Sequence, residues 1–199
     1  MSKIAHHLVL HRFLWLGIVA IAAALVAIPL ASDAHAPLAA TLYLDPVAAT
    51  VPAGASTTVE IRVDGVSDLY GLQLELSFEP TAVEVVDADS STAGTQITPG
   101  TCPAADFTVV NDASNASGVI SYAVTALNPT PPCAGNGVVA SIEFRALAED
   151  TSVLQFDDWI LANQDGMEIQ ADAQGGTLAA TVPEVFLPLV VRDAERVTR

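Results

Sequence analysis

Cys102 and Cys133 are the only cysteines of this 199-residue chain, and their surroundings favour a structural disulfide. Each lies beside proline in a stretch rich in turn residues, TPGTCPAAD and NPTPPCAGNG. A redox site would need an activated thiol, but neither cysteine has a CxxC partner or a basic neighbour. Because two cysteines in an oxidising compartment usually pair, we expect a bond that closes a ring of roughly 30 residues. The chain-entropy model gives such a bond about 3 to 4 kcal/mol of stabilisation.

Histidine, the usual general base, is confined to the N-terminal region. The four histidines are His6, His7, His11 and His35. A domain that begins near residue 41 therefore has no Ser/His/Asp system, no Cys/His system and no imidazole zinc site. A glycosidase needs only two carboxylates, but no carboxylate pair here lies among the aromatic residues that a sugar subsite needs. The sequence predicts a protein that is not an enzyme and binds no cofactor.

Two acidic segments have the oxygen donors that Ca²⁺ prefers, residues 163–168 (NQDGME) and Asp87 with Asp89. The twelve-residue calcium loop would require an acidic residue at its last position. That position is Gln174 when the loop is counted from Asn163. We therefore expect a tight turn at Asp165 and Gly166 and no metal site.

The chain is strongly acidic, with a formal net charge of −16 at pH 7. Residues 41–182 contain 19 Asp and Glu against two arginines, Arg62 and Arg145, which gives this segment a charge near −17. Because binding to a phosphate backbone depends on lysine and arginine, nucleic acid is excluded as a partner, and so is an anionic lipid surface.

The first 40 residues have the layout of a secretory signal. Lys3 and Arg12 precede an uncharged apolar run at residues 13–28, and an A-x-A site follows at residues 34–36. Pro37 is a poor residue after a cleavage site, so cleavage near Ala40 is an alternative. An uncleaved signal anchor is a second alternative, because the apolar stretch approaches the length needed to span a bilayer. The membrane is contacted only through this segment, and only if it is retained.

The remaining chain is expected to form one domain at residues 41–182 and a tail at residues 183–199. The apolar run of the tail, residues 186–191, is too short to cross a membrane. It could form an edge strand, a sorting tag or a packing arm.

Runs of alternating apolar and polar residues recur through the domain, separated by turn residues and without helical periodicity. The expected strands are residues 41–45, 57–63, 69–78, 83–86, 107–110, 118–126, 137–147, 153–161 and 177–182. About nine short strands with one inward stripe each predict an all-β, antiparallel sandwich, preceded by the N-terminal signal or anchor helix.

Three stretches carry a resemblance to a known family. Residues 69–86 (LYGLQLELSFEPTAVEVV) resemble the third and fourth strands of cohesin modules, with Phe78-Glu79-Pro80 in place of their Tyr-Asp-Pro corner. GNGVVASIEFRAL, ending at Leu147, resembles another of their strands, and Gly175-Gly176 precedes a similar last strand. Cohesins are bacterial sandwich domains that dock enzymes onto polysaccharide-degrading assemblies. The resemblance implies a cohesin-like jelly roll in a secreted, extracellular or cell-surface protein.

The resemblance also implies a site. Cohesins hold dockerins on one sheet face, through strands equivalent here to residues 69–78, 107–110, 118–126 and 153–161. The candidate contact residues on these strands are Tyr70, Gly71, Gln73, Glu75, Ser121, Ala123 and Trp159. Well-known cohesins place an Asn and an Asp on the dockerin helix at the positions of Gly71 and Gln73. The sequence therefore predicts a divergent dockerin partner, or none.

Direct binding of a polysaccharide is the alternative function, because sugar-binding modules share the sandwich architecture. Stacking on sugars needs a row of exposed rings, for which the candidates are Trp159, Tyr43 and Tyr70. Tyr122 shares its stripe with Ile120 and is expected in the core. These candidate rings are scattered along the sequence, so they are not expected to form the continuous stacking surface that a sugar requires. A structural surface or adhesion protein is a further alternative.

Overall fold

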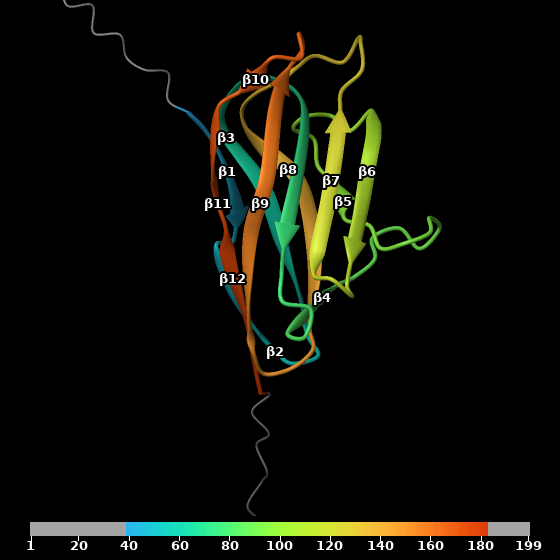
Figure 1. The fold of residues 1–199 in the computed structure, drawn as a ribbon, viewed down its shortest axis with the longest axis vertical. Helices are drawn as coiled ribbons and strands as arrows, with labels where there is room; N and C mark the ends of the chain where they lie inside the picture. The colour runs from blue at the N-terminus through green and yellow to red at the C-terminus, as the bar shows by residue number, and fades with distance from the viewer. Residues whose placement is uncertain (1–38, 183–199) are drawn as a thin grey trace, which may run out of the picture. The chain divides into compact units, whose positions relative to one another are not determined.

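The computed structural model describes residues 39–182, in which the alternating residues of this chain form β-strands (Figure 1). The prediction of an all-β domain is confirmed, since no helix occurs within this range. It follows that no helix of the described range could span a bilayer. The predicted signal or anchor helix and the predicted tail lie outside the described residues.

Twelve strands occur in the described part of the chain, where the sequence predicts about nine. They are β1 (Ala40–Asp45), β2 (Ala48–Pro52), β3 (Ser56–Ser77), β4 (Val83–Val85), β5 (Thr98–Pro99), β6 (Phe107–Ser114), β7 (Val119–Thr125), β8 (Cys133–Ala146), β9 (Thr151–Asn163), β10 (Glu168–Ile169), β11 (Ala171–Gln174) and β12 (Gly176–Thr181). Hydrogen bonds join them in the order β11-β1-β3-β9-β12-β2, with the other strands attached to β3, β7, β8 and β9.

Strand β3 is long because it belongs to both layers of the sandwich. Its first part pairs with β1 and β8, and its last part, residues 69–77, pairs with β7 and β9. Between these parts Gly65 and Asp68 have left-handed φ values of 70° and 66°, and the ladder with β8 shifts register. These residues bend the strand without ending it. The strands predicted at residues 57–63 and 69–78 are therefore one continuous strand.

Two sheets face each other as a result. One contains β11, β1, the first part of β3, β8, β4 and β5. The other contains β6, β7, the last part of β3, β9, β12 and β2, with β10 beside β9. The largest fully buried side chains come from both sheets and include Leu42, Ile61, Leu74, Tyr122 and Phe144. Tyr122 is thus a core residue, as predicted, and burial raises the pKa of its hydroxyl to about 12.

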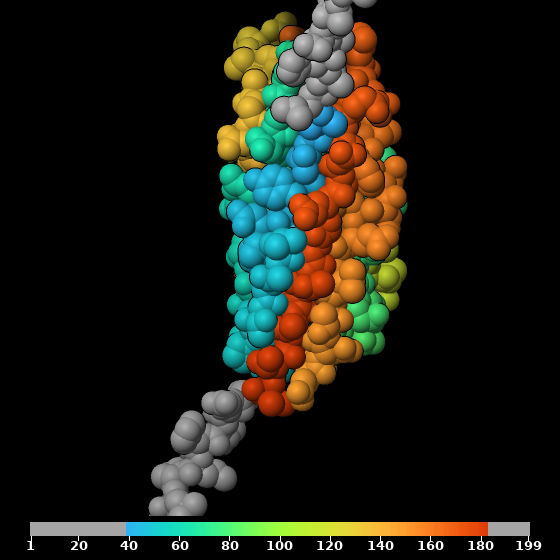
Figure 2. All heavy atoms as spheres, turned by 90° about the vertical axis from the view of Figure 1, so that its left-hand side faces the viewer, coloured from blue at the N-terminus to red at the C-terminus, as the bar shows by residue number. Residues whose placement is uncertain are grey.

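Four strands are absent from the sequence prediction, namely β2, β5, β10 and β11. Each has five residues or fewer, too few for alternation to be distinguished from chance. Two of them form parallel pairs, β1 with β11 and β12 with β2. Figure 2 shows the consequence, because the first strands (blue to cyan) run alongside the last ones (red). Both ends of the domain are thereby held in the sandwich.

The predicted disulfide is present. Cys102 lies in the loop before β6 and Cys133 begins β8, with their Cα atoms 5.4 Å apart. A side chain at Gly137 would collide with the Cβ and Sγ atoms of Cys102. The bond therefore packs directly against the backbone of β8 and fixes the loop to it.

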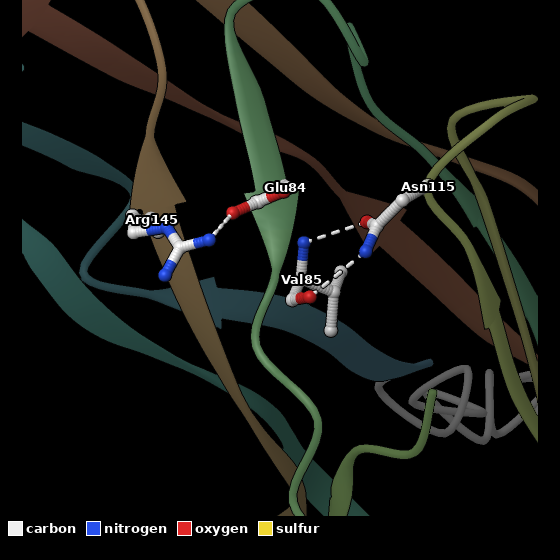
Figure 3. Close-up of polar contacts among 4 residues, drawn as sticks. All are labelled: Glu84, Val85, Asn115 and Arg145. Carbon is white, nitrogen blue, oxygen red and sulfur yellow. Dashed lines mark hydrogen bonds and ion pairs between the residues drawn. The ribbon is translucent and has the colours of Figure 1, made fainter. Parts of the chain in front are cut away.

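Asn115, directly after β6, pairs with the backbone of β4 as a neighbouring strand would (Figure 3). Its side-chain Oδ1 accepts a hydrogen bond of 2.8 Å from the Val85 N–H, and its Nδ2 donates one of 2.9 Å to the Val85 carbonyl. On the other side of β4, Glu84 forms an ion pair with Arg145 of β8 (Figure 3). Asn111 repeats the pattern with the backbone of Ile97. These amides tie both β4 and the long connection between β4 and β6 to the second sheet.

We expect an Asn115→Ala variant to lose about 2 kcal/mol of unfolding free energy, because it leaves two polar groups of a buried backbone without partners. Urea denaturation followed by circular dichroism measures the change. Ser117→Ala is the control, since this exposed loop residue should change stability by no more than about 0.5 kcal/mol. Equal stability of the two variants would contradict the role given to the Asn115 amide.

Candidate binding surface

One face of the second sheet is built by β6, β7, residues 69–77 of β3 and β9, and we call its solvent side the exposed face. Leu72, Leu74 and Leu76 of β3 are buried, so the alternate residues point outward. Antiparallel register then aligns the outward residues of β7, β3 and β9 in rows. Three successive rows contain Thr125, Gly71 and Ala162; then Ala123, Gln73 and Ile160; then Ser121, Glu75 and Asp158.

An apolar hollow of about 260 Å³ lies across the first two rows. It is lined by Gly71, Leu72, Gln73, Val109, Ala123, Val124, Ile160 and Ala162. The hollow exists because small residues occupy its floor. At Gly71 even a Cβ atom would come within 3.3 Å of the Thr125 hydroxyl.

Two exposed apolar side chains flank this hollow. Val109 of β6 is 66% exposed and Ile160 of β9 is 47% exposed. Val109 lies in an irregularity of the β6–β7 ladder, between Thr108 and Val110, which gives β6 one extra residue there. Exposed apolar groups around a concave surface are typical of a protein-binding site.

The third row is acidic. Asp112 of β6, Glu75 of β3 and Asp158 of β9 lie in it, with Ser121 of β7 between the first two, and we call these three carboxylates the acidic row. All three carboxylate residues are exposed.

The acidic row has no cationic partner among residues 39–182. The two arginines of this range belong to the other sheet, where Arg62 pairs with Glu60 at 2.6 Å and Arg145 pairs with Glu84. The hydrogen bond with Glu60, followed by one with Tyr43, raises the pKa of Arg62. No group of three or more His, Cys, Asp or Glu in the described range is arranged to hold a metal ion. The exposed face therefore combines an apolar hollow with uncompensated negative charge.

Asp106 stabilises one end of this face. Hydrogen bonds from the Thr130 side chain and from the Leu127 N–H, the latter 2.9 Å long, lower the pKa of its carboxyl group. The carboxylate, just before β6, thereby holds the segment that follows β7. Phe107, the next residue, is 54% exposed and extends the apolar part of the face.

The structure brings five of the sequence-predicted residues together on the exposed face. Gly71, Gln73 and Ala123 line the hollow, and Glu75 and Ser121 lie in the third row. Ala123, although it lines the hollow, is only 6% exposed.

The other two predicted residues lie elsewhere. Tyr70 is half-buried beside Gly71, and its carbonyl accepts a hydrogen bond of 2.8 Å from the Ala126 N–H. Trp159 is opposite Leu74 on the inward side of β9, and its indole N–H donates to the Ala171 carbonyl at 3.0 Å. Trp159 therefore packs against the core and contributes no ring to the exposed face.

Sequence reasoning does not find the four outer residues Val109, Ile160, Asp112 and Asp158. Val109, Ile160 and Asp158 lie on predicted strands, but two bulges, one in β6 and one in the β3–β9 ladder between Glu75 and Leu76, decide which side chains point outward. Asp112 lies beyond the strand predicted at residues 107–110, because β6 continues to Ser114. The adjacent acids at residues 157 and 158 are the one signal of an irregularity in β9, because they interrupt its alternation.

A family model described as the cohesin domain matches residues 42–177 of the chain. No curated protein sequence matches it. Similar solved structures exist at low identity. A type II cohesin domain from the cellulosome of Acetivibrio cellulolyticus is 21% identical, with a TM-score of 0.59 over 70% of this chain and 95% of that one.

Two further structures are similar. A non-cellulosomal cohesin from the hyperthermophilic archaeon Archaeoglobus fulgidus is 17% identical, with a TM-score of 0.55 over 72% of this chain and 91% of that one. The chain matched in a type I cohesin–dockerin complex from Clostridium thermocellum is 13% identical, with a TM-score of 0.59 over 73% and 95%. At these identities the structures show a shared fold.

Proposed function

The chain belongs to the cohesin family, and on that premise we propose that it is a non-catalytic module that docks dockerin-bearing proteins through its exposed face. The observation that carries the proposal is the apolar hollow at Gly71 and Ala123, flanked by the exposed Val109 and Ile160. A concave apolar centre with a polar rim is the usual anatomy of a protein interface. Dockerin binding is a property of the cohesin in the Clostridium thermocellum complex, and its transfer to this chain is our proposal.

The anchoring contacts must differ from those that the family resemblance implies. Gly71 and Gln73 stand where an amide and a carboxylate would bind the dockerin helix, so those hydrogen bonds are replaced. The structure offers apolar contacts from Val109 and Ile160 in their place, together with the carboxylates of the acidic row. The proposed partner is thus a divergent dockerin.

We further propose that the module acts outside the cell, in a polysaccharide-degrading or cell-surface assembly. The signal layout of residues 1–40 supports export, and the disulfide supports an oxidising compartment. The archaeal cohesin of similar fold is described as non-cellulosomal, so a role in another kind of assembly is compatible with the fold.

Capture of partners by the immobilised full chain, from an extract of the organism that encodes it, tests the proposal. We expect mass spectrometry to identify dockerin-bearing proteins. A polysaccharide-affinity gel run in parallel should show no retardation on cellulose or xylan. Retention on either polysaccharide without a protein partner would overturn the proposal in favour of direct sugar binding.

A substitution of Trp159 distinguishes dockerin docking from direct sugar binding. We expect Trp159→Phe to leave dockerin affinity within about twofold, because the indole lies on the inward side of β9 and its loss removes one hydrogen bond to Ala171. Isothermal titration calorimetry with a captured dockerin measures the affinity. A sugar-binding module that stacked its ligand on this indole would bind the sugar more weakly in the same variant, because phenylalanine offers a smaller ring.

A further inference from the structure

A second cavity, of about 450 Å³, lies between β6 and the long connection that follows β4, and we call it the edge pocket. Its walls come from residues 88–99 of the connection and residues 108–111 of β6. The two hydrogen bonds between the Asn111 amide and the Ile97 backbone hold these walls together. Val109 is the only residue that it shares with the apolar hollow of the exposed face. Its volume is in the range of sites for small molecules.

Gln96 lines the edge pocket with an amide that is only partly hydrogen-bonded. The residue is 6% exposed, and its Nε2 donates to the Ala93 carbonyl at 3.0 Å. Its Oε1 is buried and accepts no hydrogen bond from any residue of the described range. Buried acceptors almost always have a partner, so this oxygen at the wall of a cavity favours a ligand that donates a hydrogen bond.

Carboxylates surround the Gln96 amide. Asp89 lines the edge pocket, and Asp87 accepts a hydrogen bond of 3.0 Å from the Gln96 N–H. Asp112 approaches from β6, because a Cβ atom at Gly94 would lie 3.2 Å both from the Asp112 Oδ1 and from the Gln96 Nε2. No lysine or arginine lines the pocket. The resulting negative potential favours a donor that carries a positive charge.

The Asp89 carboxylate has room for one further hydrogen bond. Its Oδ1 accepts two from Ser91, and its Oδ2 accepts one of 2.8 Å from the Thr92 hydroxyl. An ionised carboxylate has about four acceptor sites, so one remains on Oδ2. The bonds from Ser91, followed by that from Thr92, lower the pKa of Asp89, which keeps the group charged.

The rest of the wall is largely apolar and includes Ile97, Pro99 and Val110. Such a wall is suited to a short alkyl chain. Other ligands fit less well. No group of three or more His, Cys, Asp or Glu within residues 39–182 is arranged for a metal ion. A sugar would meet no aromatic ring in this lining, and an anion would meet Asp89 without a basic residue.

We propose that the edge pocket binds a primary ammonium group on a short alkyl chain. The ammonium donates hydrogen bonds to the Oε1 of Gln96 and to the Oδ2 of Asp89, and the alkyl chain packs against Ile97 and Val110. A free small amine and a lysine side chain both carry this group. The site is separate from docking on the exposed face and does not depend on it.

Titration of the full chain with pentylammonium chloride tests the proposal, followed by two-dimensional ¹H–¹⁵N NMR in about 0.15 M salt, which screens loose counterion binding. We expect saturable shifts confined to the resonances of residues 88–99 and 108–111, with a Kd of about 1 mM. Pentanol, which has the same length and no charge, should bind about tenfold more weakly. Pentanoate should produce no saturable shift there.

Two variants separate the contacts. Asp89→Asn keeps the shape of an exposed residue and removes its charge, so it should weaken pentylammonium binding about tenfold and leave pentanol within about twofold. Gln96→Leu removes the buried acceptor and should weaken both ligands. Glu143→Gln is the matched control, the same loss of charge at an exposed residue of β8 in the other sheet, and should have less than a twofold effect. Thermal melts establish folding, and Asp89→Asn decides if Gln96→Leu does not fold.

A capped Gly-Gly-Lys-Gly-Gly peptide distinguishes the two sources of the ammonium group. Binding tighter than that of pentylammonium identifies a lysine side chain of another protein as the ligand, and weaker binding identifies a free amine. Equal binding of pentanol, shifts that do not saturate, or the same shifts with Ca²⁺ alone would overturn the proposal. These measurements need no dockerin, so each of these results leaves the proposed docking function as it is.

Discussion

We expect dockerin affinity to fall by about 100-fold in an Ile160→Arg variant, while the melting temperature stays within about 2 °C of that of the unchanged chain. Ile160 flanks the hollow and is 47% exposed, so an arginine there can extend into solvent without disturbing the core. A bound partner would have to bury that charge against an apolar side chain. Losses of this size are typical of substitutions at the centre of an interface.

Val153→Arg is the control for this substitution. Val153 is an equally apolar residue of the same strand, 58% exposed, and it lies outside the hollow. Surface plasmon resonance with a captured dockerin should give an unchanged affinity for it. Equal losses in the two variants, or no loss in Ile160→Arg, would remove the hollow from the binding site.

We expect replacement of both cysteines by alanine to lower the free energy of unfolding by about 3 to 4 kcal/mol. The bond joins residues 31 positions apart, so its loss restores a large loop entropy to the unfolded chain. For a domain of this size the melting temperature should fall by about 10 °C or more. Differential scanning calorimetry of the unchanged chain and of the Cys102→Ala, Cys133→Ala double variant measures both quantities.

A reducing agent provides the control. It should lower the melting temperature of the unchanged chain and leave that of the double variant where it is. A difference below about 1 kcal/mol between the two proteins would mean that the packing of β8 and its neighbours, without the bond, holds the loop at residues 100–105 in place.

The sheet architecture could be predicted because alternation identifies buried stripes. The stripe of Leu72, Leu74 and Leu76 is readable in the sequence and is buried in the structure. The bend in β3 was less visible. Gly65 permits a left-handed backbone, but Asp68 adopts the same conformation without a comparable signal, so one bent strand reads as two.

Only the central residues of the exposed face could be predicted from the sequence to point outward. Gly71, Gln73 and Glu75 follow from counting along one regular strand, whereas Trp159 and Ile160 exchange faces when a bulge shifts the register. A bulge depends on tertiary contacts with the neighbouring strands and leaves little trace in a local pattern. Trp159, named from the sequence as a candidate contact residue, therefore lies on the side of β9 opposite the hollow.

The pairing of distant strands also lies beyond local patterns. Strands β2 and β11 are short, and they are ordered by parallel partners far away in the sequence, β12 and β1. A local pattern of five residues or fewer does not indicate which distant strand will be its partner. The side-chain bonds from Asn115 to Val85 are hidden for the same reason, because 30 residues separate them.

The most direct test of docking through the exposed face is photo-crosslinking between this chain and a captured dockerin. A benzophenone amino acid is introduced at Val109, beside the hollow, and in a second protein at Thr58, an exposed residue of β3 in the other sheet. We expect a crosslinked pair after irradiation of the Val109 protein and none from the Thr58 protein. Crosslinking from Thr58 alone would place the partner on the opposite sheet and contradict the account.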